Sequence, residues 1–491
     1  MKYLLGVDVG TTGTKSLLFS EDGRLLGHAY RGYETKTPGV SRSEQNAEDW
    51  WQAVVQTVLE ACGGEEIGRN VAAISLSLQG GTMVAVDENG QQVRPAMVWS
   101  DKRCQQQQEA FLKEIGDDRT MYETTGWHLG RGLNALQIRW MKDNEPELFE
   151  KTAMFLSVPD YIALRMTGIP AVDLSNAGIN QLADIRKEAY DPKLLQFTGI
   201  TQEKLGKIVH SGDVIGCLTQ EAADVLGLTT DTVLVAGAHD QYAVAVGAGA
   251  CKAGDMVIGS GTAWVVTAIG DQPDFSSGLN QSVSAVPGLW GSLWSLGSGG
   301  VCLEWLRKQI GGSDEALSYA SINQEIQTRG AAEEGLYFVP FTAKISKERQ
   351  LAQGTFLGMS LSHDKFHLAR AIMEGVVFQI RWMTELFGIQ PSADGIKLAG
   401  GATKSLPWCQ LLADIFGLPV KIPEVADLAC VGAAVIAGVG SGVFQDYETG
   451  CSHMAVQERI LLPNPEKAEL YGKLFEEYKR AAAALQQVYV D

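Results

Sequence analysis

One short structural plan occurs twice in this chain, as an apolar strand, a turn rich in glycine and threonine, and a second strand. In the first half, the strand Tyr3–Val9 runs into Gly10-Thr11-Thr12-Gly13. In the second half, residues 255–266 repeat the plan around Gly259-Ser260-Gly261-Thr262. The repeat favours an internal duplication, in which two related α/β halves bind a ligand in the cleft between them.

The chemistry of such a turn suits a phosphate group. Glycines let the backbone approach closely, and backbone N–H groups and threonine hydroxyls donate hydrogen bonds to phosphate oxygens. Asp8 stands directly before the first turn, and a carboxylate beside a phosphate predicts Mg²⁺. Taken alone, the first turn also fits many turns that bind nothing, and the second fits a plain hairpin; the recurrence favours a polyphosphate.

A second aspartate stands at another strand end. An apolar run over 232–236 leads into Gly237-Ala238-His239-Asp240-Gln241, and catalytic groups of open α/β sheets lie at such ends. Asp240 is placed to accept a proton from a substrate hydroxyl that attacks phosphorus, which predicts an ATP-dependent kinase. The alternative is that Asp240 caps a helix over 241–250. We interpret His239 as a structural residue rather than a general base.

Size and charge restrict the fold class and the partners. The 491 residues exceed one ordinary core, and 45% are hydrophobic, which favours two α/β domains. We place the boundary near Gly247–Gly254, giving domains 1–247 and 248–491. The net charge is −18, without a basic cluster, so nucleic acid is not an expected partner.

Cysteine spacing and hydropathy bear on the cellular compartment in which the protein is expected. The eight cysteines are scattered without a C-x-x-C pair, which favours reduced thiols in a cytoplasmic protein. Met1-Lys2 leads straight into the first strand without the apolar stretch of a signal peptide. No segment reaches about 18 consecutive apolar residues, so we expect no membrane span.

Apolar periodicity and turn residues predict the remaining elements. Helices are expected over 47–62, 366–387, 407–416 and 465–487, and further strands over 16–19, 25–30, 71–78, 82–86 and 396–399.

Two longer motifs carry a family resemblance. Gly354-Thr355-Phe356-Leu357-Gly358-Met359, seven further residues and then His367 to Glu374 satisfy the C-terminal signature of the FGGY carbohydrate kinases. Residues 137–144 match their N-terminal signature, except that Gln137 replaces a lysine. The chain therefore resembles this family end to end, and the xylulokinase branch most. The resemblance implies an α/β fold of two duplicated actin-like, ribonuclease-H-like domains with an interdomain catalytic cleft. It also implies phosphoryl transfer from MgATP to a sugar hydroxyl, and leaves a homodimer open.

The resemblance assigns roles to individual residues. Asp240 is similar to the catalytic base, and Asp8 to the catalytic carboxylate that organises magnesium. The N-terminal domain then supplies the sugar site, the first phosphate loop and the base, and the C-terminal domain binds ATP and its adenosine. The residues similar to ATP ligands are Thr11, Thr12, Lys15, Gly261, Thr262, Gly400, Gly401 and Ser405.

The sugar side departs from the branch. Xylulokinases usually carry Gln-Met-His-Gly where this chain has Gln79-Gly80-Gly81-Thr82, so an imidazole is missing. Asp101 keeps its place in the segment Trp99–Arg103, and its carboxylate can accept from two vicinal hydroxyls. Without that segment, a surface ion pair of Asp101 with Lys102 or Arg103 would be an equal alternative. Gln79, Gly80, Gly81, Asp101 and Asp240 are thus the expected substrate residues. We expect a ketopentose such as xylulose. Ribulose, glycerol and gluconate stay open, as does an actin-like ATPase without a sugar substrate; a non-catalytic sugar sensor would not need both Asp8 and Asp240.

Overall fold

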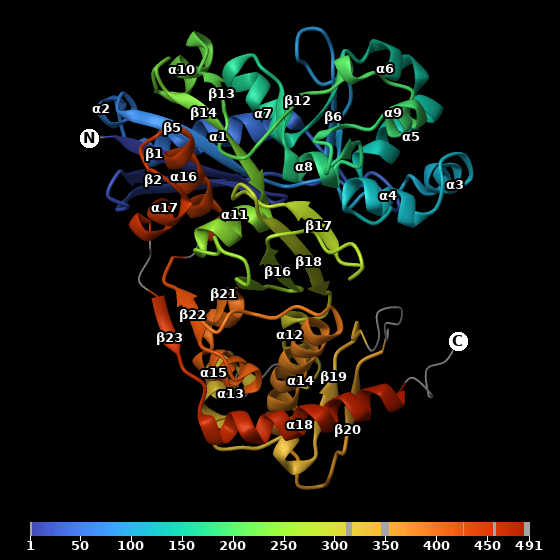
Figure 1. Ribbon diagram of the computed structural model, residues 1–491, viewed down its shortest axis with the longest axis vertical. Coiled ribbons are helices and arrows are strands. Elements are labelled where there is room, and N and C mark those ends of the chain that lie inside the picture. The colour runs from blue at the N-terminus through green and yellow to red at the C-terminus, as the bar shows by residue number, and fades with distance from the viewer. Residues whose placement is uncertain (1, 311–316, 345–352, 426, 455–457, 486–491) are drawn as a thin grey trace.

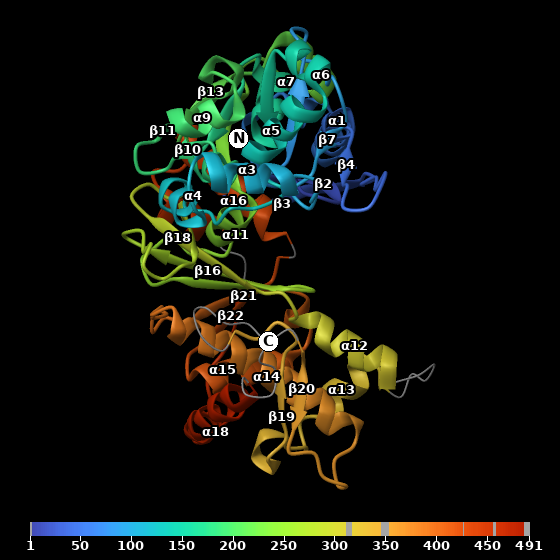
Figure 2. The same ribbon diagram turned by 90° about the vertical axis from the view of Figure 1, so that its right-hand side faces the viewer.

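The chain folds into two α/β lobes, each built on a mixed sheet (Figure 1). The computed structural model describes residues 2–310, 317–344, 353–425, 427–454 and 458–485. The view in Figure 2 separates the two halves most clearly. This architecture is the predicted duplicated fold.

The first sheet holds the N-terminal strands. Its order is β13 (Val214–Cys217), β14 (Val233–His239), β5 (Val71–Leu78), β1 (Tyr3–Val9), β2 (Gly13–Ser20) and β3 (Leu25–Gly32). β1 pairs antiparallel with β2 and parallel with β5, which in turn pairs parallel with β14. The near-continuous apolar runs of β1 and β5 are buried because helices cover both faces of this sheet.

The second sheet repeats this pairing. Its order is β17 (Asn280–Val283), β18 (Trp290–Leu296), β16 (Trp264–Gly270), β15 (Met256–Ser260), β21 (Ile396–Gly400), β22 (Val420–Pro423) and β23 (Glu458–Leu461). β15 pairs antiparallel with β16 and parallel with β21, as β1 does with β2 and β5. The expected duplication therefore holds at the level of strand pairing.

The helices follow local sequence signals. In α1 the Asn46 side chain caps the first turn, and Gly63, at φ 65°, ends the helix in the left-handed region. The helices of the first half are α1 (Ala47–Cys62), α2 (Glu65–Gly68), α3 (Gln105–Glu114), α4 (Asp118–Thr125), α5 (Asn134–Asn144), α6 (Pro146–Lys151), α7 (Val158–Thr167), α8 (Leu174–Ile179), α9 (Pro192–Thr198), α10 (Gln220–Leu226) and α11 (Asp240–Gly247). Those of the second half are α12 (Gly300–Ile310), α13 (Tyr319–Glu325), α14 (Lys365–Leu386), α15 (Leu406–Phe416), α16 (Leu428–Gly440), α17 (Tyr447–His453) and α18 (Pro465–Ala484).

Short elements complete the lobes. A small sheet in the first lobe has the order β4 (Glu44–Gln45), β7 (Ala96–Met97), β6 (Met83–Val86) and β8 (Met154–Ser157). Two-stranded pairs join β9 (Ala171–Asp173) to β12 (Lys207–Val209), β10 (Ala183–Asp184) to β11 (Ala189–Tyr190), and β19 (Tyr337–Val339) to β20 (Thr355–Leu357). Single 3₁₀ turns span Gln202–Lys204, Ala332–Glu334 and Gly401–Lys404.

Two helices fill the junction between the lobes. α11 and α16 pack backbone to backbone, since a Cβ added to Gly247 would lie 1.9 Å from the Leu428 carbonyl oxygen. A Cβ on Gly432 would lie equally close, at 1.9 Å, to the carbonyl oxygen of Ala243. α16 also packs against β1 and β5, so a helix from the second half of the chain covers the first sheet. The predicted boundary falls between α11 and β15, but α16 and α17 then return to the first lobe.

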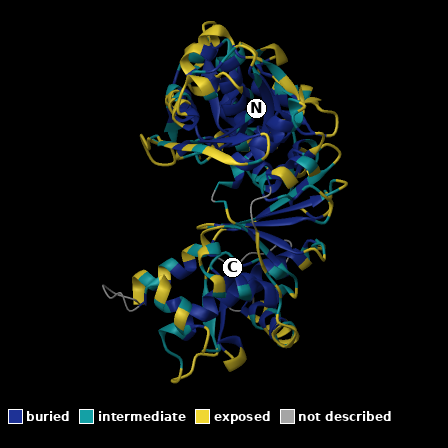
Figure 3. Cartoon of the chain, turned by 90° about the vertical axis from the view of Figure 1, so that its left-hand side faces the viewer, coloured by how far each residue is buried: buried dark blue, intermediate teal, exposed yellow. Residues whose placement is uncertain are grey.

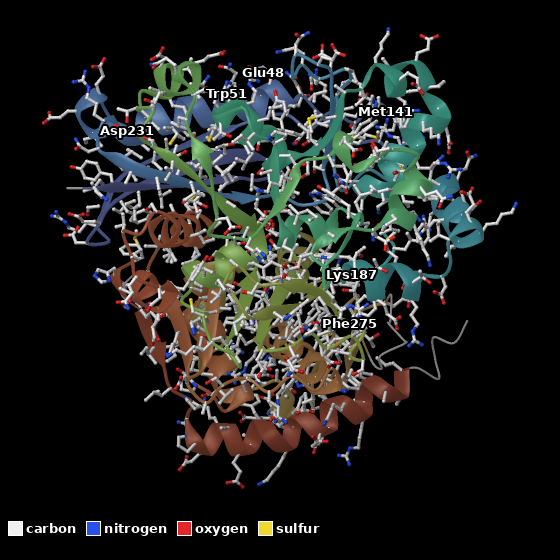
Figure 4. All side chains as sticks on the ribbon, turned by 45° about the horizontal axis from the view of Figure 1, so that its top comes forward. Glu48, Trp51, Met141, Lys187, Asp231 and Phe275 are labelled. Carbon is white, nitrogen blue, oxygen red and sulfur yellow. The ribbon has the colours of Figure 1, made fainter. Side chains whose placement is uncertain are left out.

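The lobes also meet at their rim. Phe275, from the segment between β16 and β17, lies close to Lys187 of the first lobe (Figure 4). The guanidinium of Arg186 stands 5.1 Å from the centre of the Phe275 ring. Tyr122 packs against the same ring at 5.5 Å between centroids. Contacts between the lobes therefore extend beyond α11 and α16.

The predicted elements are confirmed to within a few residues. The predicted C-terminal helix is α18, and its expected last residues, 486 and 487, lie outside the described part. The sheets and inner helices are buried and exposed residues lie on outer loops and helices (Figure 3). No helix in the described ranges is long and apolar enough to cross a membrane. All eight cysteines are free thiols.

Candidate active site at the domain junction

The sheet register brings the two predicted catalytic aspartates together. β1 and β14 lie on either side of β5, and Leu78 of β5 is the register partner of both Val9 and His239. Asp8 comes directly before Val9, and Asp240 comes directly after His239. Both aspartates therefore lie at the same end of the parallel strands β1, β5 and β14. The two carboxylates are close enough for the charge of Asp240 to act on Asp8.

Asp8 is half-buried beside a hydroxyl donor. Burial raises the pKa of Asp8 to about 6, and the negative charge of Asp240 acts in the same direction. The Ser77 hydroxyl donates to Asp8 Oδ1 over 2.8 Å and opposes this rise. The site thus concentrates negative charge that a bound cation would offset.

Lys15, a predicted ATP ligand, forms an ion pair with Asp427. Its Nζ lies 2.5 Å from Oδ1 of Asp427, at the start of α16. Burial acts to lower the pKa of Lys15, but Asp427 holds it above its ordinary value. The pair joins segments 412 residues apart at the junction.

The first Gly/Thr turn is held by side chains of the same lobe. Thr11 Oγ1 accepts a hydrogen bond from the Trp99 indole over 3.0 Å, and the carbonyl of Thr11 accepts from Gln45. Thr12 is exposed at the tip of the turn. The predicted phosphate loop is therefore an ordered turn with one threonine open to the outside.

A cavity of about 530 Å³ lies beside the second turn, within the size range of ligand sites. Four of the predicted nucleotide residues, Gly261, Thr262, Gly401 and Ser405, line it. Gly400, the fifth in this half, has φ 90°, and a Cβ there would lie 2.9 Å from the Ser260 carbonyl oxygen. Only glycine suits that turn, which opens the backbone toward the cavity.

The predicted sugar residues have different surroundings. The amide of Gln79 is buried and donates to the Gly10 carbonyl over 3.3 Å. Asp101 is fully buried; its carboxylate accepts from Arg103, at 2.7 Å to Nη2, and from the backbone N–H of Ser43 at 2.7 Å. Asp101 therefore belongs to a buried ion-pair cluster with Arg103 and Glu44, and its oxygens are occupied by protein donors.

Asp240 does not act as the cap of its helix. α11 begins at Asp240 itself, and the preceding residue, His239, makes no side-chain cap hydrogen bond. The Asp240 side chain keeps 37% of its surface exposed. The capping alternative is therefore wrong, and the carboxylate is accessible from the junction.

The two halves also match known proteins. The description "FGGY family of carbohydrate kinases, N-terminal domain" matches residues 3–247, and its C-terminal counterpart matches residues 256–441. The chain belongs to the FGGY family of carbohydrate kinases. As a member, it is an ATP-dependent sugar kinase.

Individual relatives of this FGGY kinase differ in their substrates. The chain is 28% identical to "Xylulose kinase" of Bacillus subtilis, over 98% of this chain and 96% of that protein. It is also 28% identical to "Gluconokinase" of Bacillus licheniformis, over 99% and 97%. The crystal structure of xylulose kinase from Rhodospirillum rubrum superposes with a TM-score of 0.91 at 26% identity, covering all of both chains.

The carboxylates of this FGGY kinase fit a magnesium ion that arrives with a nucleotide. Among the described residues there is no group of three or more His, Cys, Asp or Glu side chains that could hold a metal alone. Magnesium in nucleotide enzymes is usually held by one or two carboxylates together with phosphate oxygens and water. Asp8, with Asp240 nearby, would supply such carboxylates.

Several residues of the site in this FGGY kinase could not be predicted from sequence motifs. Ser77, Asp427 and Trp127 carry no motif of their own. The fold brings Ser77 to Asp8, Asp427 to Lys15 and the Trp127 ring to His239. The sequence places His239 beside Asp240 and predicts a structural residue there.

Proposed function

We propose that this kinase transfers the γ-phosphoryl group of MgATP to a primary hydroxyl of an uncharged ketose, a ketopentose such as xylulose. The observation that carries the proposal is the accessible carboxylate of Asp240 at the junction, close to Asp8 and the first phosphate turn. We also propose that the kinase acts in the cytoplasm.

Asp240 acts as the general base in this proposal. Its carboxylate accepts the proton of the attacking hydroxyl while that oxygen approaches phosphorus. The backbone of the turns at Thr11 and Gly261 donates hydrogen bonds to the phosphate oxygens, and Asp8 would hold magnesium. Bound magnesium would neutralise the charge that develops on the transferred group.

The charge of the site favours an uncharged acceptor over gluconate. A sugar acid needs a cation to pair with its carboxylate once water is excluded. In the described ranges no lysine or arginine forms an ion pair with Asp240, and the nearby Lys15 already pairs with Asp427. Asp8 and Asp240 place two carboxylates close together, and Asp173 adds a third beside the neighbouring His239. A ketose or polyol avoids this repulsion.

The rival function is an actin-like ATPase in which water is the nucleophile. Sugar would then leave the rate of ADP release unchanged. A kinase whose lobes close on its substrate should instead release ADP faster when the right acceptor is present.

The test is ADP release with MgATP across ketopentoses, aldoses, polyols, glycerol and gluconate. We expect one ketose to stimulate strongly and gluconate to have little effect. Asp240→Asn should lower the stimulated turnover roughly 10²- to 10⁴-fold, with unchanged affinity for a non-hydrolysable ATP analogue. Stimulation by gluconate alone would contradict the substrate class, and no stimulation by any acceptor would favour the ATPase.

A further inference from the structure

A histidine lies directly against the catalytic aspartate. The His239 side chain is buried, with 8% of its surface exposed, and its Nδ1 lies 3.3 Å from Oδ1 of Asp240. The geometry does not make a hydrogen bond, and neither atom has a hydrogen-bond partner among the described residues. The backbone N–H of His239 donates to Ser175 Oγ over 2.9 Å, so this N–H has a partner while the ring Nδ1 has none in the described ranges.

A third unsatisfied polar atom lies nearby. The Trp127 ring stands edge-on to the His239 ring, with 5.8 Å between centroids. The Trp127 Nε1 donor is buried and also lacks a protein partner in the described ranges. Buried polar groups are nearly always hydrogen-bonded, and a polar ligand at this point would satisfy groups that the protein itself leaves without partners.

Gly80 makes room for this imidazole. A Cβ at Gly80 would lie 2.6 Å from Cδ2 of His239 and 2.8 Å from Cγ2 of Ile179. The φ angle of Gly80 lies outside the left-handed region, so the backbone alone would accept another residue. Glycine at this position is therefore required by the side chains that face it.

Gly81 has a different constraint. Its φ is 70°, and a Cβ there would lie 2.4 Å from Cδ2 of Leu133. A histidine at 81, as in the Gln-Met-His-Gly run of xylulokinases, would be strained and would clash. Position 81 therefore disfavours a histidine, and the imidazole beside Asp240 comes from position 239.

We propose that His239 is a sugar-binding and specificity-determining residue, which uses the space left by Gly80 to replace the histidine absent from position 81. This inference rests on the proposed kinase function. The attacking hydroxyl lies at Asp240, and the imidazole binds the oxygen on the neighbouring carbon of the sugar. The Trp127 indole donates to a sugar oxygen on the same side.

The first test compares two acceptors with the wild type and with His239→Leu. One is the best ketose of the panel, and the other lacks the oxygen on the carbon next to the phosphorylated one. In the wild type we expect kcat/KM to fall roughly ten- to a hundredfold for the deoxy analogue. In His239→Leu the two acceptors should differ less than about threefold, mainly because KM for the parent sugar rises.

Matched variants separate binding from folding. His239→Gln, whose amide can donate and accept, should keep part of the discrimination. Gly80→Ala should push the ring aside and lose discrimination as His239→Leu does, although it leaves the histidine in place. Two control variants should leave the discrimination between the acceptors unchanged. They are His453→Leu on α17 and Gly472→Ala on α18; a Cβ at Gly472 would meet nothing within 4 Å.

The outcomes distinguish this inference from the proposed function. If no acceptor stimulates the wild type, the kinase proposal fails first. If a ketose stimulates but His239→Leu and Gly80→Ala, folded by circular dichroism and binding ATP analogue normally, keep the wild-type discrimination, His239 does not contact the sugar and the inference is overturned.

Discussion

The two copies of the strand–turn–strand plan share a backbone but not a chemistry. β1 closes on β2 with the pair Val9 and Thr14, and β15 closes on β16 with Ser260 and Trp264. The second-to-last residue of β1 is Asp8, and the second-to-last residue of β15 is Gly259. The same scaffold therefore presents a charged group in one half and an uncharged turn in the other.

The surroundings of the two copies also differ in polarity. Asp8 lies with Ser77, Asp240 and the Lys15–Asp427 pair, whereas the second turn opens on a cavity walled by Trp264 and Trp408. The charged groups thus gather at the first turn and the apolar cavity at the second, although both turns are predicted to contact phosphate. Pairing of backbone groups fixes the strands without specifying what their end residues carry.

The largest expected effect comes from making the first copy resemble the second. Asp8→Asn removes the carboxylate expected to hold magnesium, and we expect turnover to fall roughly 10²- to 10³-fold because transition-state charge is no longer offset. The matched change Gly259→Ala, whose Cβ would meet nothing closer than 3.7 Å, should leave turnover within about twofold.

Steady-state rates over a magnesium series would check this prediction. Equal losses in both variants would contradict a division of roles between the copies. The melting temperature of Asp8→Asn should not fall, because the amide replaces a carboxylate whose charge burial disfavours.

An intermediate effect should follow from filling the second copy. Gly401 lines the cavity, and Gly401→Leu should raise KM for ATP by roughly tenfold or more, since overpacking costs about 1–3 kcal/mol. KM for the sugar should stay the same. Gly401→Ala, with its Cβ 3.4 Å from the Ser260 carbonyl oxygen, is the control that should bind ATP nearly normally. A selective rise in the sugar KM would place the nucleotide elsewhere.

The smallest effect should come from the ion pair that ties the first copy to α16. Lys15 and Asp427 keep 39% and 29% of their side chains exposed, so breaking the pair should cost at most about 1 kcal/mol of unfolding free energy. Urea denaturation of Lys15→Met, Asp427→Asn and the double variant would measure it.

The same variants sharpen the role of Lys15. If Lys15 also reaches a phosphate, Lys15→Met should raise KM for ATP a few-fold, whereas Asp427→Asn frees the ammonium and should not. Equal changes in KM for ATP in both variants would indicate that the Lys15–Asp427 pair has only a structural role.

Much of the fold followed from local sequence signals. Asn46, Gly63 and the apolar spacing between them delimited α1, because capping and helical periodicity act within a few residues. The two Gly/Thr turns were found for the same reason, since a turn that approaches phosphate closely needs glycine. The packing of α16 on the first sheet was not predicted, because no local signal tells a helix which sheet it will cover.

The candidate site was predicted less completely. For Asp101 the alternative ion pair with Arg103 forms, but it is buried rather than at the surface, and the role of Asp101 at the sugar stays a prediction. His239 was interpreted as a satisfied structural residue, yet its Nδ1 has no partner in the described part of the chain. Hydrogen-bond satisfaction depends on neighbours distant in sequence, so a motif cannot reveal it.

The sequence by itself determined the duplicated α/β plan, its two Gly/Thr turns and two strand-end aspartates, because hydrophobic periodicity and turn chemistry are local. Only the tertiary structure decided which groups meet. It set Asp8 near Asp240 across β5, joined Lys15 to Asp427 over 412 residues, and placed the His239 ring against Gly80. Such encounters depend on sheet register and helix packing, which the whole chain settles together.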